Sequence, residues 1–229
     1  MCEQYVARSD EPFRIDELWP FTDKLERNGI ASYGWGATWL GADGELHSYR
    51  DTGTFVDDAK GRSKVGAQTT RAVLVHLRRP SKLSTIGPAD TQPFDDPAGR
   101  FSFSHNGALR HEGRFRKRFR DAGRLHGRAD TEVGARWLED EWDGDANVPA
   151  VLRHLHEAFE GDANLAVLTR DGAGYHYAGN SENPVFTFDF GRIRVASTGI
   201  HSLDRSFFRY VAPEATNRKL VPRSRTASI

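Results

Sequence analysis

The sequence has little cysteine, no long apolar run and no excess of charge of either sign. Its 229 residues contain one cysteine, which excludes an internal disulfide and a zinc site built from several thiolates. Lys and Arg number 32, as do Asp and Glu, so the chain lacks the positive potential that nucleic-acid binders direct at phosphates. No apolar stretch approaches the ~18 residues of a transmembrane helix. We therefore expect neither nucleic-acid nor membrane partners.

The beginning of the chain also lacks the features of a secretory signal. Its first twenty residues carry five acidic side chains and no apolar core segment. Aromatic residues make up 11% of the chain, which argues against intrinsic disorder. These features together predict a cytoplasmic protein. Because no internal repeat or linker is present, we expect a single domain over residues 2–217, and because 218–229 lack apolar periodicity, we expect a flexible C-terminal tail there.

The distribution of apolar residues predicts an α+β fold. Residues 12–26 are expected to form helical turns, and residues 51–64 and 81–99 are expected to be loops. Helices are predicted at 131–142 and 148–160, and strands at 33–40, 45–50, 71–77, 101–105, 164–169, 175–178, 185–190 and 193–197. Strands on both sides of a helical pair indicate α+β or layered sandwich architecture.

Histidine and the basic residues point to no specific ligand. The nine histidines include no His-x-x-x-His pair, and His154 and His156 point to different faces of one helix, so we expect no metal and no cofactor. Residues 110–128 are densely basic and predict an amphipathic helix with a solvated basic face. A patch that docks an acidic partner or an anionic substrate is the alternative interpretation.

The one cysteine stands at position 2, where it has a chemistry that internal cysteines lack. A lone cysteine is usually a small buried hydrophobic residue. Removal of Met1 would give Cys2 a free α-amine, whose pKa of about 7.7–8.0 lies close to the thiol value of about 8.5. Such an amine can take the thiol proton and return it to a leaving amine. The site would then need only an oxyanion hole and a substrate clamp.

Residues suited to these two tasks occur along the chain. Asn106 and Gly107 offer a side-chain amide and a backbone N–H where the 101–105 strand is expected to end and the chain to turn. A plain Asn-Gly turn is the alternative. Arg78 suits bidentate binding of a carboxylate, or else it is a solvated arginine. Asp130 suits an ammonium group, or else it caps the following helix.

Taken in order, these residues resemble the class II glutamine amidotransferases, which belong to the N-terminal nucleophile hydrolases. The short stand-alone members with a Gly-Trp-Gly strand are the most similar. The resemblance covers somewhat more than the first half of the chain. It rests on Met1-Cys2-Glu3, Tyr33-Gly34-Trp35-Gly36, His76-Leu77-Arg78, Gln92-Pro93-Phe94, Ser104-His105-Asn106-Gly107 and Asp130-Thr131-Glu132.

The resemblance implies a four-layer αββα sandwich and a role for each matching residue in catalysis. Cys2 would be the nucleophile once Met1 is lost, with its α-amine as the general base. Asn106 and Gly107 would hold the oxyanion.

The resemblance also implies how glutamine is bound. Arg78 would bind the α-carboxylate, assisted by Ser81, and Asp130 would bind the α-amino group. Two departures concern the surroundings of the site. Gln92 stands where many members have His, which implies a different pocket edge. Arg79-Pro80 replaces the Trp-Ala common in ammonia-channelling synthases, which argues against a channel gate of that type.

The predicted activity is hydrolysis of the side-chain amide of glutamine, or of a γ-glutamyl amide, through a thioester on Cys2. In one version the protein is a glutaminase subunit that supplies ammonia to a separate synthetase. In a second version it is a γ-glutamyl-conjugate hydrolase like those of ergothioneine biosynthesis. The alternative interpretation is a protein of another class, a catalytically silent binding or regulatory protein with the same fold.

Overall fold

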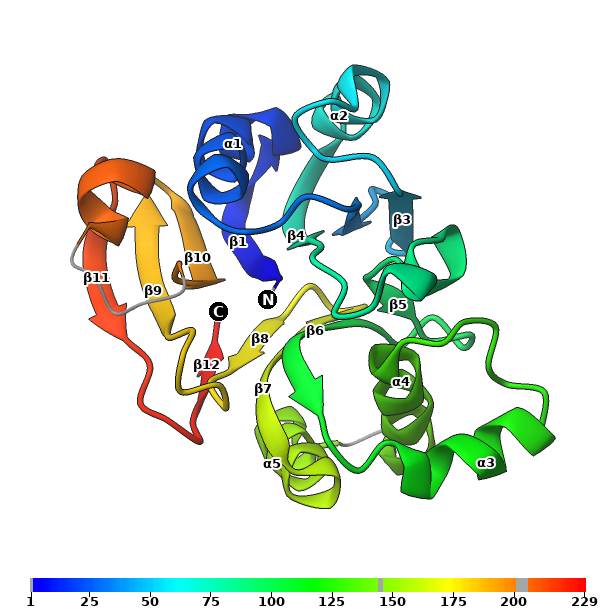
Figure 1. Cartoon of the computed structure of the whole chain (residues 1–229). Helices are drawn as coiled ribbons and strands as arrows, with labels where there is room; N and C mark the ends of the chain where they lie inside the picture. Colours follow the sequence, from blue (N-terminus) through cyan, green and yellow to red (C-terminus); the bar gives the residue numbers. More distant parts are fainter. Residues whose placement is uncertain (1, 144–145, 201–205) are drawn as a thin grey trace.

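The computed structural model describes residues 2–143, 146–200 and 206–229, whose strands form two antiparallel sheets (Figure 1). The first sheet runs in the order β11 (Thr216–Leu220), β9 (Val185–Phe190), β10 (Ile193–Thr198), β1 (Glu3–Arg14), β4 (Thr69–Leu77), β2 (Trp35–Leu40) and β3 (Leu46–Asp51). The second sheet runs in the order β12 (Thr226–Ser228), β8 (Gly174–Tyr177), β7 (Gly161–Thr169), β6 (Phe101–Leu109) and β5 (Phe94–Asp95).

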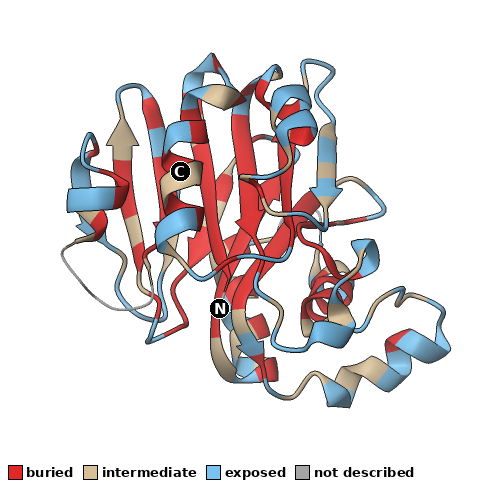
Figure 2. Ribbon diagram, turned by 45° about the horizontal axis from the view of Figure 1, so that its top comes forward, coloured by how far each residue is buried: buried red, intermediate tan, exposed pale blue. Residues whose placement is uncertain are grey.

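Helices cover the outer faces of both sheets, so the expected αββα sandwich is confirmed (Figure 1). The first sheet is covered by α1 (Trp19–Asn28) and α2 (Ala59–Gly66), and the second by α3 (Gly113–Asp121), α4 (Asp130–Glu141) and α5 (Val148–Phe159). Buried residues concentrate in the strands, while the helices expose their outer faces (Figure 2). Within the described residues, no helix is long and apolar enough to cross a bilayer.

Successive side chains of the central strands alternate between two cores, one under the helices of the first sheet and one between the two sheets. On β1, Tyr5 packs toward the helices that cover the first sheet, whereas Val6 packs between the two sheets. On β4, Val73 and Val75 belong to the helix-side core and Leu74 to the core between the sheets. The prediction that residues 71–77 form a strand buried on both faces is therefore confirmed.

Two predicted segments differ from the structure. Residues 12–26 were expected to form helical turns. This is wrong for residues 12–14, because β1 extends to Arg14, whereas a 3-10 helix spans Ile15–Leu18 and α1 follows from Trp19. The expected loop 51–64 contains the start of α2, whose N-cap Asp58 accepts a hydrogen bond from the Gly61 N–H at 2.8 Å. The segment 51–64 is mostly polar, so no apolar stripe in the sequence indicates its helix.

The segment 218–229, expected to be a flexible tail, contributes to two strands instead. Residues of β11 pair with β9, and those of β12 pair with β8, where Ala227 lies opposite His176. Backbone pairing needs no apolar periodicity, which is why the side-chain pattern gave no signal.

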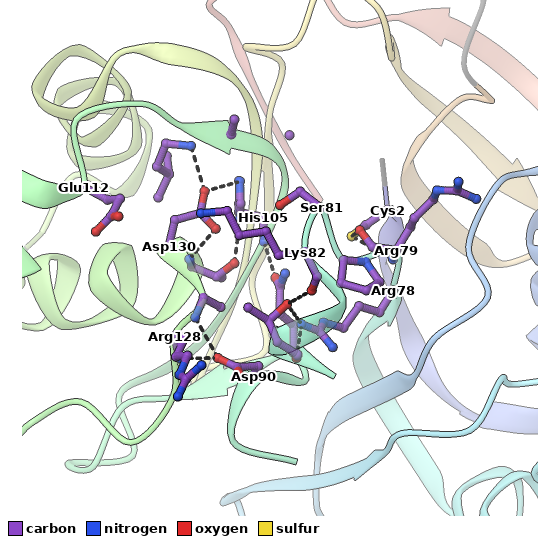
Figure 3. Close-up of a pocket in the computed structure, with 18 of the residues that line it drawn as sticks. Cys2, Arg78, Arg79, Ser81, Lys82, Asp90, His105, Glu112, Arg128 and Asp130 are labelled. Carbon is purple, nitrogen blue, oxygen red and sulfur yellow. Dashed lines mark hydrogen bonds and ion pairs between the residues drawn. The ribbon is translucent and has the colours of Figure 1, made fainter. Parts of the chain in front are cut away.

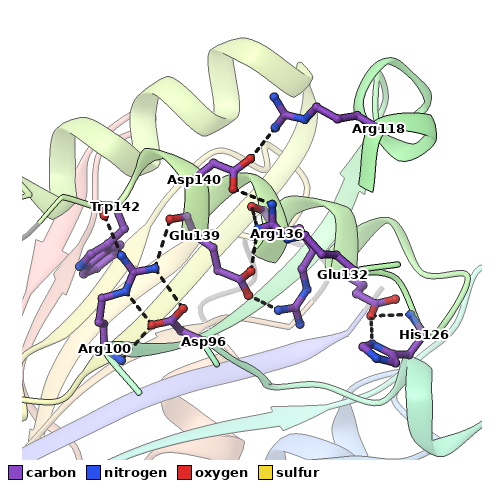
Figure 4. A network of polar contacts seen from close by, with 10 residues as sticks. Asp96, Arg100, Arg118, His126, Glu132, Arg136, Glu139, Asp140 and Trp142 are labelled. Carbon is purple, nitrogen blue, oxygen red and sulfur yellow. Dashed lines mark hydrogen bonds and ion pairs between the residues drawn. The ribbon is translucent and has the colours of Figure 1, made fainter. Parts of the chain in front are cut away.

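The basic segment 110–128 contains α3 and is paired with acidic residues of α4 (Figure 4). Asp140 accepts from Arg118 and Arg124 at 2.7 Å each, and Glu139 accepts from Arg124 at 2.9 Å. These bonds hold α3 against α4. Part of the basic face is thus matched within the chain and is not a free docking surface.

We predict that His176 makes stability depend on pH. Its ring is buried, and burial lowers its pKa from 6.5 to about 4. The unfolded chain gains a proton before the folded chain does, so the free energy of unfolding should fall as pH drops from 6.5 to 4. The slope contributed by one histidine is at most about 1.4 kcal/mol per pH unit.

Urea unfolding at several pH values would measure this slope. His176→Gln should reduce it, because the variant has no titrating ring. His154→Gln is the control, since the side chain of His154 is 60% exposed. An equal slope in wild type and His176→Gln would contradict the prediction.

Candidate active site

A cavity of about 690 Å³ opens where the start of β1 and the end of β4 meet β6 and the start of α4 (Figure 3). Of the site residues predicted from the sequence, its walls include Cys2, Arg78, Ser81, Gly107 and Asp130. Asn106 is fully buried and contacts Cys2 from β6. The fold thus brings together six residues that are spread over more than half of the chain.

Cys2 places a buried thiol at one side of this cavity. Its Sγ accepts a hydrogen bond from the Arg79 N–H at 3.2 Å, and the residue is only 8% exposed. Burial raises the pKa of the thiol from 9.0 to about 11, against the opposing effects of that hydrogen bond and of the Arg78 charge. The thiol is therefore neutral at pH 7 and needs a base to become a nucleophile. Met1 lies outside the described residues, so the role of the Cys2 α-amine stays a prediction.

Arg78 follows β4 and is one of the residues that line the cavity. Its Nη2 donates to the carbonyl oxygen of Thr85 at 2.7 Å and to the Thr85 hydroxyl at 3.1 Å. The Nη1 atom is buried and has no hydrogen-bond partner in the described structure. A buried cation with one unused donor edge is suited to bind a carboxylate of a ligand. Ser81, by contrast, is exposed at the cavity wall.

Asp130 presents a fixed carboxylate from the other side of the cavity (Figure 3). It is the first residue of α4 and not its N-cap, which is Ala129. Its Oδ2 accepts from the Leu109 N–H at 3.0 Å, and its Oδ1 accepts from the Thr131 N–H at 3.0 Å. Asp130 is therefore not the N-cap residue, although its carboxylate accepts one N–H of the first turn of α4 and also connects α4 to β6.

Asn106 and Gly107 lie inside β6, not at a turn after it. The strand continues to Leu109 and stays paired with β7 over both residues, so the expected Asn-Gly turn is wrong. The Asn106 Nδ2 donates to the Cys2 carbonyl oxygen. Gly107 has φ +125°, and a Cβ there would lie 1.9 Å from the Asp162 carbonyl oxygen. This close approach of two backbones explains why the position holds glycine.

The sequence analysis missed a group of buried polar residues around Cys2. Three further asparagines, Asn164, Asn180 and Asn183, connect to Asn106 or to Cys2. They lie in a strand and in the loop after β8, and nothing in their spacing separates them from ordinary loop or edge residues. Only the pairing of β6 with β7 brings Asn164 opposite Asn106.

Glu3 is a second missed feature, a carboxyl group buried beside the site. Its Oε2 accepts from the Thr198 hydroxyl at 2.8 Å and from the Asn183 amide at 3.3 Å. Burial raises its pKa from 4.5 to about 8, so the group is largely protonated at pH 7. Within the described residues, no group of three or more His, Cys, Asp or Glu side chains could hold a metal ion.

Solved structures share this fold, although no family model and no curated protein matches the chain. Glutamine phosphoribosylpyrophosphate amidotransferase from B. subtilis, complexed with ADP and GMP, is 15% identical, with 100% of this chain and 49% of that chain covered and a TM-score of 0.72. A glutamine aminotransferase class-II domain protein from Silicibacter pomeroyi is 16% identical, with coverage of 99% and 94% and a TM-score of 0.61. A predicted glutamine amidotransferase from Pseudomonas aeruginosa is 13% identical, with coverage of 99% and 96% and a TM-score of 0.54.

These comparisons confirm the resemblance at the level of the fold. The chain has the N-terminal nucleophile hydrolase fold of class II glutamine amidotransferase domains. It spans about half the length of the B. subtilis enzyme, 49% of that chain.

We predict that Gly107→Ala destabilises the protein by roughly 2 kcal/mol or more, because the new Cβ meets backbone and the residue has positive φ. Gly113→Ala is the matched control. Gly113 is the first residue of α3, where a Cβ meets nothing within 4 Å. That control should change stability by less than about 1 kcal/mol. Equal unfolding midpoints in urea for the two variants would contradict the close approach at Gly107.

Proposed function

We propose that the protein is a thiol-dependent amidohydrolase that acts on glutamine or on a γ-glutamyl amide. The observation that carries this proposal is the convergence of three groups on one cavity. These are a cysteine thiol, an arginine edge without a partner and a fixed carboxylate, supplied by Cys2, Arg78 and Asp130. A glutamyl substrate offers the matching groups, namely a side-chain carbonyl, an α-carboxylate and an α-ammonium.

Binding of the substrate would use charge on opposite sides of the cavity. The free Nη1 of Arg78 would take the α-carboxylate, and Ser81 would add a hydroxyl from the same wall. Asp130 would take the α-ammonium, since its carboxylate is already oriented by two N–H donors. With its α-carboxylate and α-ammonium both held, the substrate would have its side-chain carbonyl within reach of the thiol.

The reaction would begin with the processed chain, in which Cys2 is the first residue. Its α-amine takes the thiol proton, directly or through one water, as Sγ attacks the side-chain carbonyl carbon. A base is required because burial raises the thiol pKa to about 11. The Gly107 N–H and the second hydrogen of the Asn106 amide would stabilise the oxyanion.

Collapse of the tetrahedral intermediate would break the carbon–nitrogen bond. The leaving nitrogen takes the proton from the α-amine and departs as ammonia or a larger amine, which leaves a glutamyl thioester on Cys2. Water then attacks the thioester and releases glutamate, and the thiol is restored with its proton. No cofactor enters this sequence of steps.

The size of the cavity supports a second version of this activity, hydrolysis of a larger γ-glutamyl conjugate. The cavity is lined by many residues besides Cys2, Arg78 and Asp130, among them Glu112 and Arg128 (Figure 3). Its volume of about 690 Å³ would admit a leaving amine larger than ammonia. In the other version, the ammonia passes to a separate synthetase.

We predict that 6-diazo-5-oxo-norleucine, a glutamine analogue, forms one covalent adduct with the processed protein. The thiol supplies its proton, the diazo group leaves as nitrogen gas, and a bond forms between Sγ and carbon. Intact mass should show loss of Met1 and a single addition that is absent from Cys2→Ala. Retained Met1 would contradict the α-amine mechanism.

Free glutamine and a γ-glutamyl conjugate should then be compared as substrates. Faster turnover of the conjugate would select the larger-substrate version, and turnover of glutamine would select the glutaminase version. Processed protein with neither adduct nor turnover would instead identify the catalytically silent binding protein.

We also predict that Arg78→Lys raises KM for the substrate about tenfold, because lysine keeps the charge but loses the planar fork. Arg192→Lys is the matched control, since Arg192 lies on the surface in an ion pair with Glu17. Steady-state kinetics of both variants would measure the effect. An unaltered KM in Arg78→Lys would remove Arg78 from the substrate clamp.

A further inference from the structure

Four asparagine side chains form a buried cluster against Cys2. Asn106 lies on β6, Asn164 lies opposite it on β7, and Asn180 and Asn183 lie between β8 and β9. Their exposed fractions are 0%, 0%, 6% and 0%. Buried amides cost free energy unless their donors and acceptors are matched, so the orientation of each amide matters.

The backbone determines the orientation of the Asn164 amide. Its Oδ1 accepts from the N–H groups of Gly179 and Asn180, each at 3.0 Å. A backbone N–H can only donate, so this end of the amide must be the oxygen. The opposite end is therefore Nδ2, which donates to the Asn183 carbonyl oxygen at 2.6 Å and to the Asn106 Oδ1 at 3.2 Å. Asn164 thus makes all four hydrogen bonds that its amide allows.

The orientation of Asn164 affects the hydrogen bonds that the Cys2 carbonyl oxygen accepts. Asn164 and Asn180 donate to the oxygen end of the Asn106 amide at 3.2 and 3.3 Å, so the Nδ2 end of Asn106 faces the Cys2 carbonyl oxygen, to which it donates. Asn183, whose backbone is held by Asn164, places its own Nδ2 3.5 Å from the same oxygen. A chain of hydrogen bonds therefore connects the backbone of the loop after β8 to the candidate nucleophile through Asn164.

We propose that Asn164 is a positioning residue for the reaction. It does not line the cavity, and it acts through Asn106 and Asn183, which hold the Cys2 backbone and point an amide donor toward the position of the oxyanion. The catalytic part of this inference rests on the proposed function. The structural part, restraint of Cys2 by Asn164, stands on the hydrogen bonds alone.

Asn164→Asp is the sharpest variant, because it keeps the shape and the two backbone acceptor contacts but removes both donations. It should lower kcat about 10-fold to 100-fold, less than the loss of about 10²–10³ that removal of an oxyanion donor itself causes. KM should change less than about twofold, because Arg78 and Asp130 are untouched. Lowering the pH should partly restore kcat relative to wild type, since a protonated aspartic acid can donate again.

Asn147→Asp is the matched control. Asn147 caps α5, where its Oδ1 accepts from the Ala150 N–H at 3.2 Å, and an aspartate can make the same bond. Its kcat should equal that of wild type. Adding Asn164→Asp to Asn106→Ala should lower kcat by less than the product of the two single losses, because part of the effect of Asn164 passes through Asn106. Fully additive losses would overturn the proposal.

Alkylation of Cys2 by iodoacetamide tests the restraint without any substrate. Release of the Cys2 backbone should expose the thiol. Under conditions where each protein is folded, Asn164→Asp should therefore react several times faster than both the wild type and Asn147→Asp. If the aspartate variant fails to fold, Asn164→Ser, uncharged and smaller, takes its place with the same expected signs.

The two measurements, kcat and the rate of Cys2 alkylation, distinguish a failure of this inference from a failure of the proposed function. A wild-type protein without turnover would refute the proposed function, and the alkylation rates would then decide the restraint alone. A wild-type protein with turnover, but with unchanged kcat and alkylation in both Asn164 variants, would overturn the positioning role only.

Discussion

The hydrogen bond from the Asn106 amide to the carbonyl oxygen of Cys2 joins the two sheets at the end where the cavity opens. Cys2 immediately precedes β1, which is paired on both sides within the first sheet, and Asn106 lies on β6, which is paired on both sides within the second. Asn106 is thus held within the second sheet, and Cys2 adjoins a central strand of the first. The geometry of the candidate site therefore depends on how the two sheets are held together.

The interface between the sheets becomes polar toward this end. Farther from the cavity it consists of apolar side chains such as Val6, Leu74 and Ala166. Toward the cavity, the Ser104 hydroxyl donates to the Gln4 side chain at 2.7 Å, and the Gln4 amide donates to the Asn164 carbonyl oxygen at 3.2 Å. The hydrogen bonds of Gln4, Ser104 and Asn164 offset the cost of burying these side chains, and they fix relative position with a directionality that apolar packing lacks.

Sequence patterns predicted elements whose burial follows a simple period. Residues of β4 alternate between two cores, and α5 buries Leu152, Leu155 and Phe159 along one stripe, so both were identified. The strand β1 was not identified, although it lies near the centre of its sheet. Its first residues, Glu3 and Gln4, are polar and are buried only because Thr198, Asn183 and Ser104 bond to them from distant positions.

The sequence by itself determined which chemical groups are available, namely a thiol near the N-terminus, an arginine after a buried strand and an aspartate at the start of a helix. The spacing of apolar residues indicated α+β or layered sandwich architecture, and the resemblance to a known family implied the four layers. Only the tertiary structure decided that the Cys2 thiol is buried with a raised pKa, that Asn106 lies within a strand, and that Asn164 fixes the direction of its amide. Cys2 and Asn106 are 104 positions apart, and such contacts follow from strand register and sheet packing, which no local periodicity encodes.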